Sequence, residues 1–328
     1  MDQPWFKGMK SSAAVVSPVV APSDVRRAGP TRGESPRAWT RRATRTADFL
    51  TLAKPRLNFL VLITTLAGMY LAAPEGIPLA ILVHALVGTA LVAGGAAALN
   101  QVWERETDNL MRRTRLRPIP DGRLRVSDGT WFGTLLAATG LIELTGKVNP
   151  LSAAVAAATL VSYVFVYTPL KKRTSLSTLV GAVPGALPPV IGWAAATGTI
   201  SMPAIVLFGI VFLWQMPHFL AIAWLYRDDY EHAGIPLLPV LEPDGRRTGQ
   251  QALLYAAALW PVTLLPAAVG IADAPYSIVA TVLGFGLIAL SALFARHRTT
   301  KTARHLFLYS ILYLPLLWGA LVADRLWL

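Results

Sequence analysis

Long apolar stretches dominate this chain, and short polar connections separate them. Nine stretches are long enough to cross a hydrocarbon core of about 30 Å, which needs roughly 20 helical residues. We predict helices over 57–73, 78–100, 129–146, 150–169, 176–197, 202–225, 250–270, 275–295 and 304–323. The first is short and the third is only weakly apolar. The pattern predicts an all-α, polytopic membrane bundle of about nine transmembrane helices.

The composition agrees with a chain embedded in a membrane. Of its 328 residues, 54% are apolar and only 15% are charged, whereas about a quarter of a typical soluble domain is charged. The chain contains no cysteine, which excludes disulfides, thiolate catalysis and cysteine metal ligands. The net charge of +12 would suggest nucleic acid in a soluble protein, but the positions of the basic residues give another explanation.

The basic residues segregate with the predicted topology. If the N-terminus is cytoplasmic, all of the 30 Lys and Arg residues except Lys147 and Arg325 fall on the cytoplasmic side. This agrees with the positive-inside rule and predicts a cytoplasmic N-terminus and an outer C-terminus. We expect a disordered basic cytoplasmic tail over 1–48 and a single membrane-embedded domain over 49–328.

The second apolar stretch runs into the polar segment NQVWERETDNLMRRTRLRPIP, residues 100–120. Asn100, Glu104 and Asp108 are four residues apart, so a continuing helix places them on one face. An amide oxygen and two carboxylates suit Mg²⁺, which typically bridges to a phosphate. Four arginines that follow are placed to clamp phosphate oxygens: Arg112, Arg113, Arg115 and Arg117. For this cluster alone, a solvated helix end with its acids paired to arginines is favoured.

A second acidic cluster follows the sixth apolar stretch, in WLYRDDYEHAGIPLLP (224–239). Asp228, Asp229 and Glu231 fall on the same predicted side of the membrane as the first cluster. Two facing acidic clusters repel unless cations lie between them, so the pair favours a diphosphate held by two Mg²⁺ ions. An ordinary turn at a helix end is the alternative for each cluster by itself.

Other polar groups lie beside or within the apolar stretches. Tyr167 and Lys171 are four residues apart at the cytoplasmic end of the fourth stretch, and Lys172 follows. They are suited to diphosphate oxygens, or they are an interfacial tyrosine with a basic flank. The Gly/Pro-rich run 181–192 predicts a kink.

Gln215 and His218 lie inside the sixth apolar stretch, where polar groups usually face the bundle interior. The imidazole would contact a haem iron or orient a bulky substrate. Equally, it would be a core histidine bonded to a carbonyl freed by Pro217.

These motifs resemble those of the UbiA superfamily of intramembrane prenyltransferases. Asn100-x3-Glu104-x3-Asp108 is similar to the superfamily's N-x-x-x-D-x-x-x-D, with Glu replacing the first Asp, and Tyr167-x3-Lys171 matches its Y-x-x-x-K. Within the superfamily, DNLMRRTRLRPIPDG, WQMPHF and DDYEHAGIPLLP are similar to the haem O synthase branch. Ser177 stands where that branch usually has Asn.

The resemblance implies a nine-span bundle with a lateral cleft that faces the lipid. It also implies Mg²⁺-dependent transfer of a farnesyl group from farnesyl diphosphate to a vinyl group of haem b, which gives haem O for terminal oxidases. Glu104 and Asp108 would hold one Mg²⁺ ion, Asp228 and Asp229 would hold a second, and Asn100 would add a neutral oxygen. The residues implied for substrate binding are Arg105, Arg113, Arg117, Tyr167, Lys171 and Lys172 for the diphosphate, and His218 for the haem.

Three alternatives stay open. The first is prenyl transfer to an aromatic quinone precursor. The second is a secondary transporter, which the scarcity of charge at mid-depth disfavours. The third is a non-enzymatic scaffold for oxidase assembly. The Arg-rich tail could also be a mitochondrial transit peptide, but Asp2, Asp24 and Glu34 weaken that idea, so we expect the bacterial plasma membrane rather than the mitochondrial inner membrane. The positive-inside rule places the active site toward the cytoplasm. The resemblance implies haem A synthase or oxidase assembly proteins as partners.

Overall fold

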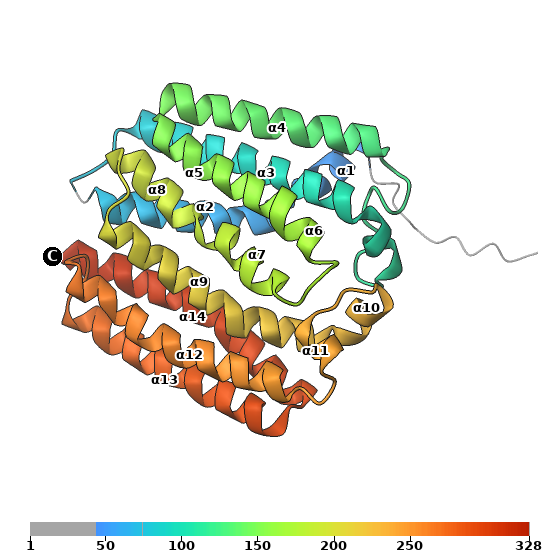
Figure 1. Cartoon of the computed structure of the whole chain (residues 1–328). Coiled ribbons are helices and arrows are strands. Elements are labelled where there is room, and N and C mark those ends of the chain that lie inside the picture. The colour runs from blue at the N-terminus through green and yellow to red at the C-terminus, as the bar shows by residue number, and fades with distance from the viewer. Residues whose placement is uncertain (1–43, 74, 328) are drawn as a thin grey trace, which may run out of the picture. The chain divides into compact units, whose positions relative to one another are not determined.

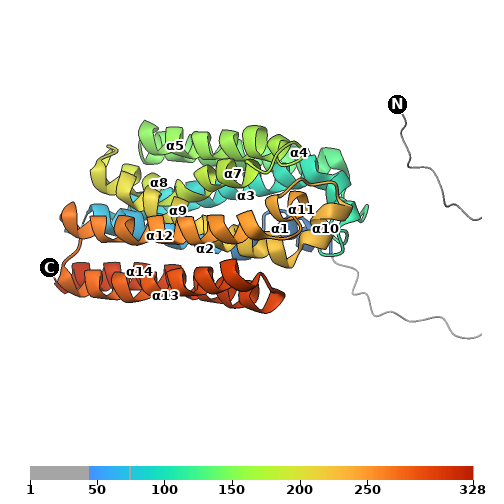
Figure 2. The same ribbon diagram turned by 60° about the horizontal axis from the view of Figure 1, so that its bottom comes forward.

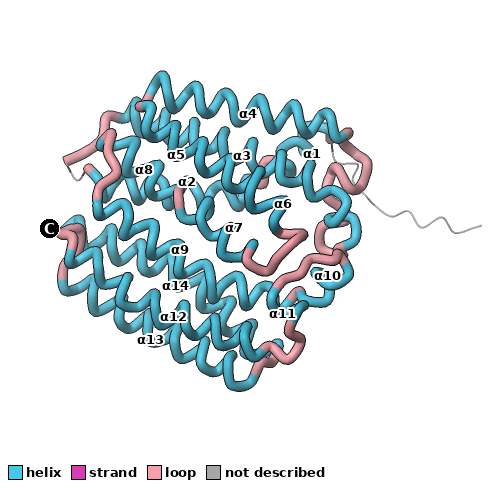
Figure 3. Tube along the Cα trace, viewed as in Figure 1, coloured by secondary structure: helices cyan, strands magenta, loops and turns pink. Residues whose placement is uncertain are grey.

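The computed structural model describes residues 44–73 and 75–327, and within them the chain is helical, with no strands (Figure 3). The elements are α1 (Arg45–Leu52), α2 (Pro55–Ala72), α3 (Leu79–Leu110), α4 (Val126–Lys147), α5 (Pro150–Val161), the π-helical η1 (Ser162–Tyr167), α6 (Thr168–Leu170), α7 (Ser177–Ala186), α8 (Pro188–Thr197), α9 (Met202–Leu225), α10 (Arg227–His232), α11 (Leu238–Leu241), α12 (Arg246–Ala268), α13 (Ala274–His297) and α14 (Thr300–Trp327).

The structure confirms the predicted all-helical bundle with several membrane-spanning helices. In the described part of the chain, eight helical segments are long and apolar enough to cross a membrane. They correspond to eight of the nine predicted stretches. The third stretch forms α4, but α4 is not among the eight, because glycine, threonine and charged residues interrupt its apolar run. Eight apolar helices together with α4 agree with the predicted bundle of about nine helices.

The less apolar α4 packs along α3 through glycine faces (Figure 1). A Cβ on Gly95 would lie 2.6 Å from the carbonyl oxygen of Gly133, and a Cβ on Gly140 would lie 2.6 Å from that of Gly88. Small residues let helix backbones approach closely where no hydrophobic effect drives association in lipid. The same pair of helices brings His84 Nδ1 to 2.6 Å from Glu143 Oε1, a contact that the sequence did not indicate.

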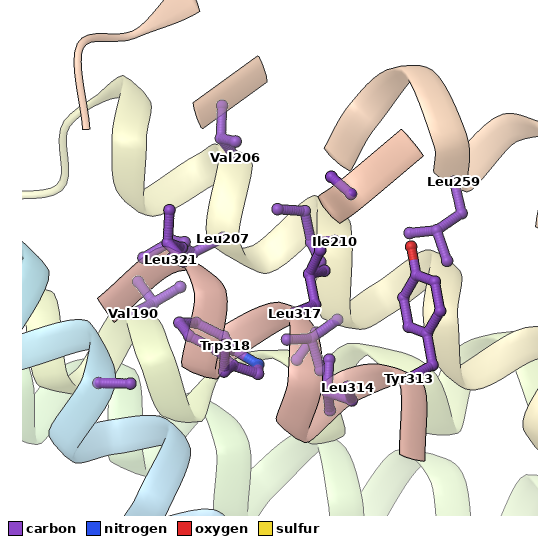
Figure 4. Packing of buried hydrophobic residues seen from close by; sticks show 14 of the residues in the cluster. Val190, Val206, Leu207, Ile210, Leu259, Tyr313, Leu314, Leu317, Trp318 and Leu321 are labelled. Carbon is purple, nitrogen blue, oxygen red and sulfur yellow. The ribbon is translucent and has the colours of Figure 1, made fainter. Parts of the chain in front are cut away.

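The C-terminal helices pack on α9 through a buried apolar cluster (Figure 4). Leu207 and Ile210 of α9 are buried with Leu317 and Leu321 of α14, and Leu259 of α12 is fully buried in the same cluster. Figure 2 shows α13 and α14 side by side at one edge of the bundle. This half of the chain supports α9, one wall of the site described below.

Two polar segments meet at one end of the bundle, at the right in Figure 3. Met111, which follows α3, packs in a small apolar cluster with Tyr230 of α10 and with Ile235. The two acidic segments at 100–120 and 224–239 are therefore neighbours, as the sequence predicted. The Arg113 guanidinium also lies 5.4 Å from the centre of the Tyr226 ring. Neither contact places the acids of the two segments against each other.

Proline breaks the fifth predicted span where a kink was expected. α7 ends at Ala186, and α8 begins at Pro188 after the single residue Leu187. Proline lacks the amide hydrogen that would continue the helical ladder. The π-helical turn η1 was not predicted, because no sequence signal marks it.

The start of the described chain differs slightly from expectation. Helix α1 begins at Arg45, inside the predicted tail of 1–48, and the side chain of Thr44 accepts a hydrogen bond from the amide of Ala47. Asp48 of α1 is buried and accepts a hydrogen bond of 2.9 Å from Arg123 Nε. The rest of the predicted tail, residues 1–43, lies outside the described residues.

Candidate active site

A cavity of about 430 Å³ opens among α2, α3, η1, α7 and α9. Its polar end is lined by Lys54, Asn100, Glu104, Arg113, Arg117, Tyr163, Tyr167, Lys171 and Tyr230. The rest of its wall is mainly apolar and includes Val61, Val92, Ala96, Leu160, Pro188, Ile191, Phe219 and Ile222. A charged end joined to a long apolar slot suits an amphiphilic ligand with an ionic head and a hydrocarbon tail.

Helix α3 carries the three oxygen-bearing side chains that the sequence singled out. It continues to Leu110 without a break, so Asn100, Glu104 and Asp108 share one face. All three side chains are buried, with exposed fractions of 2%, 5% and 0%. Buried carboxylates are rare unless they are paired or bind a cation. This face of α3 therefore requires basic side chains or a bound cation next to it.

Each carboxylate has a basic partner from another part of the chain. Lys171 Nζ donates a hydrogen bond of 2.9 Å to Glu104 Oε1, across 67 residues of sequence. Arg117 donates a short hydrogen bond to Asp108 Oδ2. Tyr167 and Lys171, which the sequence paired by their spacing, both line the cavity that Glu104 also lines.

The second carboxylate oxygen of Asp108 does not share the hydrogen bond from Arg117. Asp108 Oδ1 is buried and has no hydrogen-bond partner among the described residues. An unsatisfied buried carboxylate oxygen is costly, and it lies on the same helix face as Glu104 and the amide of Asn100. This donor set, two carboxylates and one amide oxygen, fits a hard cation such as Mg²⁺.

Lys54 belongs to the site although sequence reasoning did not select it. It precedes Pro55, the first residue of α2, and adopts a left-handed backbone with φ of +49°, which is strained for a residue with a Cβ. Its Nζ donates a hydrogen bond of 3.3 Å to Asn100 Oδ1. The signal available in the sequence was a lysine immediately before the proline that opens the first span.

Two lysines at the polar end differ in their acid–base behaviour. Burial, with Arg117 nearby, lowers the pKa of Lys54 from 10.5 to about 8. Burial also disfavours the charged form of Lys171, but Tyr167 and Glu104 outweigh it and raise the pKa of Lys171 above its ordinary value. Lys171 is therefore a permanent cation, and Lys54 loses its charge in mildly alkaline solution.

The charge balance at the polar end favours an anion. Lys54, Arg113, Arg117 and Lys171 line the cavity, while Glu104 lines it and Asp108 lies directly behind. Four cations thus face two carboxylates. A cation bound by the carboxylates would make the pocket more positive still, as a diphosphate requires.

Other residues predicted for the site lie elsewhere. Asp228, with 84% of its side chain exposed, pairs with its neighbour Arg227, and neither it nor Asp229 lines the cavity. Within residues 44–73 and 75–327, no group of three or more His, Asp or Glu side chains is arranged to hold a metal ion. The structure therefore does not bring Asp228 or Asp229 to the cavity wall, and the second metal site stays a prediction.

Three expected substrate contacts also point away. Arg105 pairs with Glu106 at 2.9 Å, and Lys172 is exposed. His218 Nδ1 lies 2.8 Å from Ser310 Oγ of α14, and its ring stacks on Trp214. His218 thus faces the α9–α14 interface and not the cavity, as a core histidine would, but its partner is the Ser310 hydroxyl and not a carbonyl freed by Pro217.

Ser177 and Gln215 are among the further polar residues that line the cavity. Ser177, which departs from the haem O synthase pattern, is fully buried, and its Oγ has no hydrogen-bond partner in the described part of the chain. Gln215, noted as a polar group at depth, faces α7 from α9. Periodicity could not have selected either residue, because both lie in stretches that are apolar all round.

Comparisons with known proteins agree with this geometry. The model of the UbiA prenyltransferase family matches residues 61–319. A protein of Solibacter usitatus named protoheme IX farnesyltransferase is 46% identical over 287 residues, which cover 85% of this chain and 98% of that protein. A protein of the same name from Myxococcus xanthus is 45% identical and covers 85% of this chain and 95% of its own length.

Solved structures share the fold at low sequence identity. A structure described as digeranylgeranylglyceryl phosphate synthase aligns with a TM-score of 0.75 at 16% identity, covering 86% of this chain and 99% of its own. A UbiA homolog from Archaeoglobus fulgidus bound to GPP and Mg²⁺ aligns with a TM-score of 0.58 at 17% identity, covering 84% and 99%. With the family match over most of the described chain, these findings show that the chain belongs to the UbiA prenyltransferase family.

Proposed function

We propose that this protein transfers the farnesyl group of farnesyl diphosphate to a vinyl group of haem b, with Mg²⁺ as cofactor. The observation that carries the proposal is a cavity that joins a cationic end to an apolar slot. The diphosphate occupies the end lined by Lys54, Arg117 and Lys171, and the hydrocarbon tail lies along the apolar wall. Relatives at 45–46% identity that are named for this activity support the choice of substrates.

In this proposal, α3 holds the metal. Glu104, Asp108 and the amide oxygen of Asn100 are the ligands, and the unpartnered Asp108 Oδ1 is the clearest sign of an expected cation. Mg²⁺ bound there would neutralise the charge that develops on the diphosphate as its bond to the allylic carbon breaks. Asp228 is highly exposed and neither Asp228 nor Asp229 lines the cavity, which favours one ion held by α3 over the two ions expected from the sequence.

The chain's own cations perform the rest of the leaving-group stabilisation. Lys171 and Arg117 are already held at the cavity by Glu104 and Asp108, so they need little reorganisation to meet a diphosphate. Preorganised charges of this kind usually contribute more to catalysis than any other single effect. Tyr167 is positioned beside Lys171 and would donate its hydroxyl hydrogen to a diphosphate oxygen.

The location of the reaction follows from the charge distribution along the chain. The positive-inside rule supports a cytoplasmic position for the polar end, and the bacterial relatives support a bacterial plasma membrane. Delivery of the product to haem A synthase or to oxidase assembly proteins is part of the proposal and rests on the family resemblance alone.

The test is a mass-spectrometric assay on the purified protein in lipid with haem b, farnesyl diphosphate and Mg²⁺. The proposal expects a haem heavier by a farnesyl group plus a hydroxyl group, and no such product with EDTA. Prenylation of an aromatic acid in place of haem would retain the family chemistry and overturn the acceptor. No product from either acceptor would overturn the proposed activity.

A further inference from the structure

A carboxamide with a fixed orientation lies in the wall of the cavity. Gln215 is buried in the middle of α9, with an exposed fraction of 4%. Its Nε2 donates two hydrogen bonds of 3.1 Å, to the carbonyl oxygens of Ala182 and Val211. Flipping the amide would place its oxygen against two carbonyl oxygens, so the orientation is determined by the hydrogen bonds.

The orientation directs the Oε1 atom of Gln215 toward the cavity side of α7. Gln215 lines the cavity, and its oxygen has no hydrogen-bond partner among the described residues and is not sealed from the cavity. A Cβ added to Gly185 would lie 2.0 Å from this oxygen. The glycine therefore leaves the space that the carboxamide oxygen occupies, and the wall contains an open acceptor in an otherwise mainly apolar region.

The position of this acceptor relative to the polar end follows from the geometry of α7. The ring of Tyr167 covers Gly181, where an added Cβ would lie 2.6 Å from the ring. Gly185 is four residues further on, which is about 6 Å along a helix axis. The Gln215 oxygen therefore lies about one helical turn beyond Tyr167, a proposed headgroup contact. Because the allylic carbon is joined directly to the diphosphate, an acceptor at this distance would be within reach of a water molecule beside the new bond.

We propose that Gln215 holds the water molecule that completes the proposed reaction. This inference rests on the proposed farnesyl transfer to haem b. The π electrons of the vinyl group form a carbon–carbon bond to the allylic carbon as the bond from that carbon to the diphosphate oxygen breaks. The positive charge then lies on the vinyl carbon attached to the porphyrin, and a lone pair of the water oxygen captures it. The proton that the water loses passes to the released diphosphate.

The chemistry of a carboxamide suits this role. Gln215 Oε1 accepts one hydrogen bond from the water and leaves the water's lone pair free for the cation. A neutral amide adds no full negative charge to the apolar slot, where an unpaired carboxylate would be costly. Without the acceptor, the cation loses a proton instead, and the product is a farnesylated haem lighter by one water.

The experiment measures how the product divides between these two fates. Gln215→Met keeps the length and volume of the side chain and removes the acceptor. The assay is the one described above, on full-length protein in lipid, with hydrated and dehydrated farnesyl haem separated by mass and released diphosphate counted independently. We expect the ratio of hydrated to dehydrated product to fall about tenfold, the effect of one lost hydrogen bond, with diphosphate release changed by less than about threefold.

Two further variants control for folding and location. Gly185→Ala perturbs the same oxygen through the added methyl group without altering Gln215, and it is expected to move the product ratio in the same direction. If Gln215→Met does not fold, Gly185→Ala alone tests the water-holding role. Gln251→Met makes the same substitution on α12, away from the cavity, and is expected to behave as the wild type.

The outcomes separate this inference from the proposed function. If the wild type makes no farnesylated haem, the proposed function is wrong, and the role of Gln215 that rests on it is wrong as well. If the wild type makes the hydrated product and both Gln215→Met and Gly185→Ala make it in an unchanged ratio, the water-holding role is overturned and the farnesyl transfer stands. Equal loss of diphosphate release and of both products in a folded Gln215→Met protein would also overturn it, because the residue would then act in substrate binding.

Discussion

The titration of Lys54 gives the sharpest test of the polar end. The fall of its pKa from 10.5 to about 8 corresponds to about 3 kcal/mol disfavouring its charged form in the folded protein. Because the folded-state pKa is lowered, the cation is present below pH 8 and is lost as the pH rises through 8. The pKa of Lys171 is raised, so Lys171 stays charged over this range.

The expected consequence is an alkaline limb in kcat/KM for farnesyl diphosphate, which reports ionisations of the free enzyme. Roughly nine-tenths of Lys54 is protonated at pH 7 and about one-tenth at pH 9. A charged hydrogen bond contributes about 1.5–3 kcal/mol, so the neutral lysine retains about a tenth to a hundredth of the activity. We therefore expect kcat/KM to fall about fivefold to ninefold between pH 7 and pH 9.

Lys54→Arg provides the comparison that assigns this limb. Arginine stays charged throughout the range, so the variant should lose the limb near pH 8 even if its activity at pH 7 is lower. Arg56→Lys, at an exposed position two residues further on, should keep the wild-type profile. A limb that persists in Lys54→Arg, or a wild-type rate that is flat to pH 9, would refute the assignment of this ionisation to Lys54.

Three other outcomes are expected. Asp108→Asn should lower turnover by about a hundredfold or more, as removal of a preorganised charged group does. Thermal unfolding in the same lipid checks that the variant remains folded. A folded variant with wild-type turnover would contradict the role of Asp108 as a metal ligand. EDTA should abolish farnesyl transfer, and added Mg²⁺ should restore it; activity in EDTA would contradict the metal assignment. Gly192→Ala should lower the melting temperature, because its Cβ would lie 2.0 Å from the carbonyl oxygen of Thr65 and overpacking costs about 1–3 kcal/mol. Gly319→Ala, with open space around it, is the matched control and should leave the melting temperature unchanged or slightly higher.

Much of the fold was readable from the sequence because bilayer thickness and helix rise together fix the length of a span. The same reasoning placed Asn100, Glu104 and Asp108 on one face, since a four-residue spacing within one helix is a local property. It also located the break near Pro188, where the backbone chemistry of proline acts on its own helix. The family motifs then indicated the chemistry before any contact was known.

The sequence did not determine which way each span faces. A helix that is apolar all round has no stripe that distinguishes the core from the lipid, because both are apolar. His218 was therefore expected at the cavity and instead lies against Ser310 of α14, whereas Gln215, three residues earlier, faces the cavity.

The partners of the charged groups were likewise decided only by tertiary structure. Lys171 reaches Glu104 across 67 residues, and Lys54 reaches Asn100 across 46. The acids of α10 share an end of the bundle with Met111, yet Asp228 points outward. The order of residues determines the periodicity within one helix, but the rotation and docking of each helix depend on side-chain packing against all its neighbours, and the site is formed by that packing.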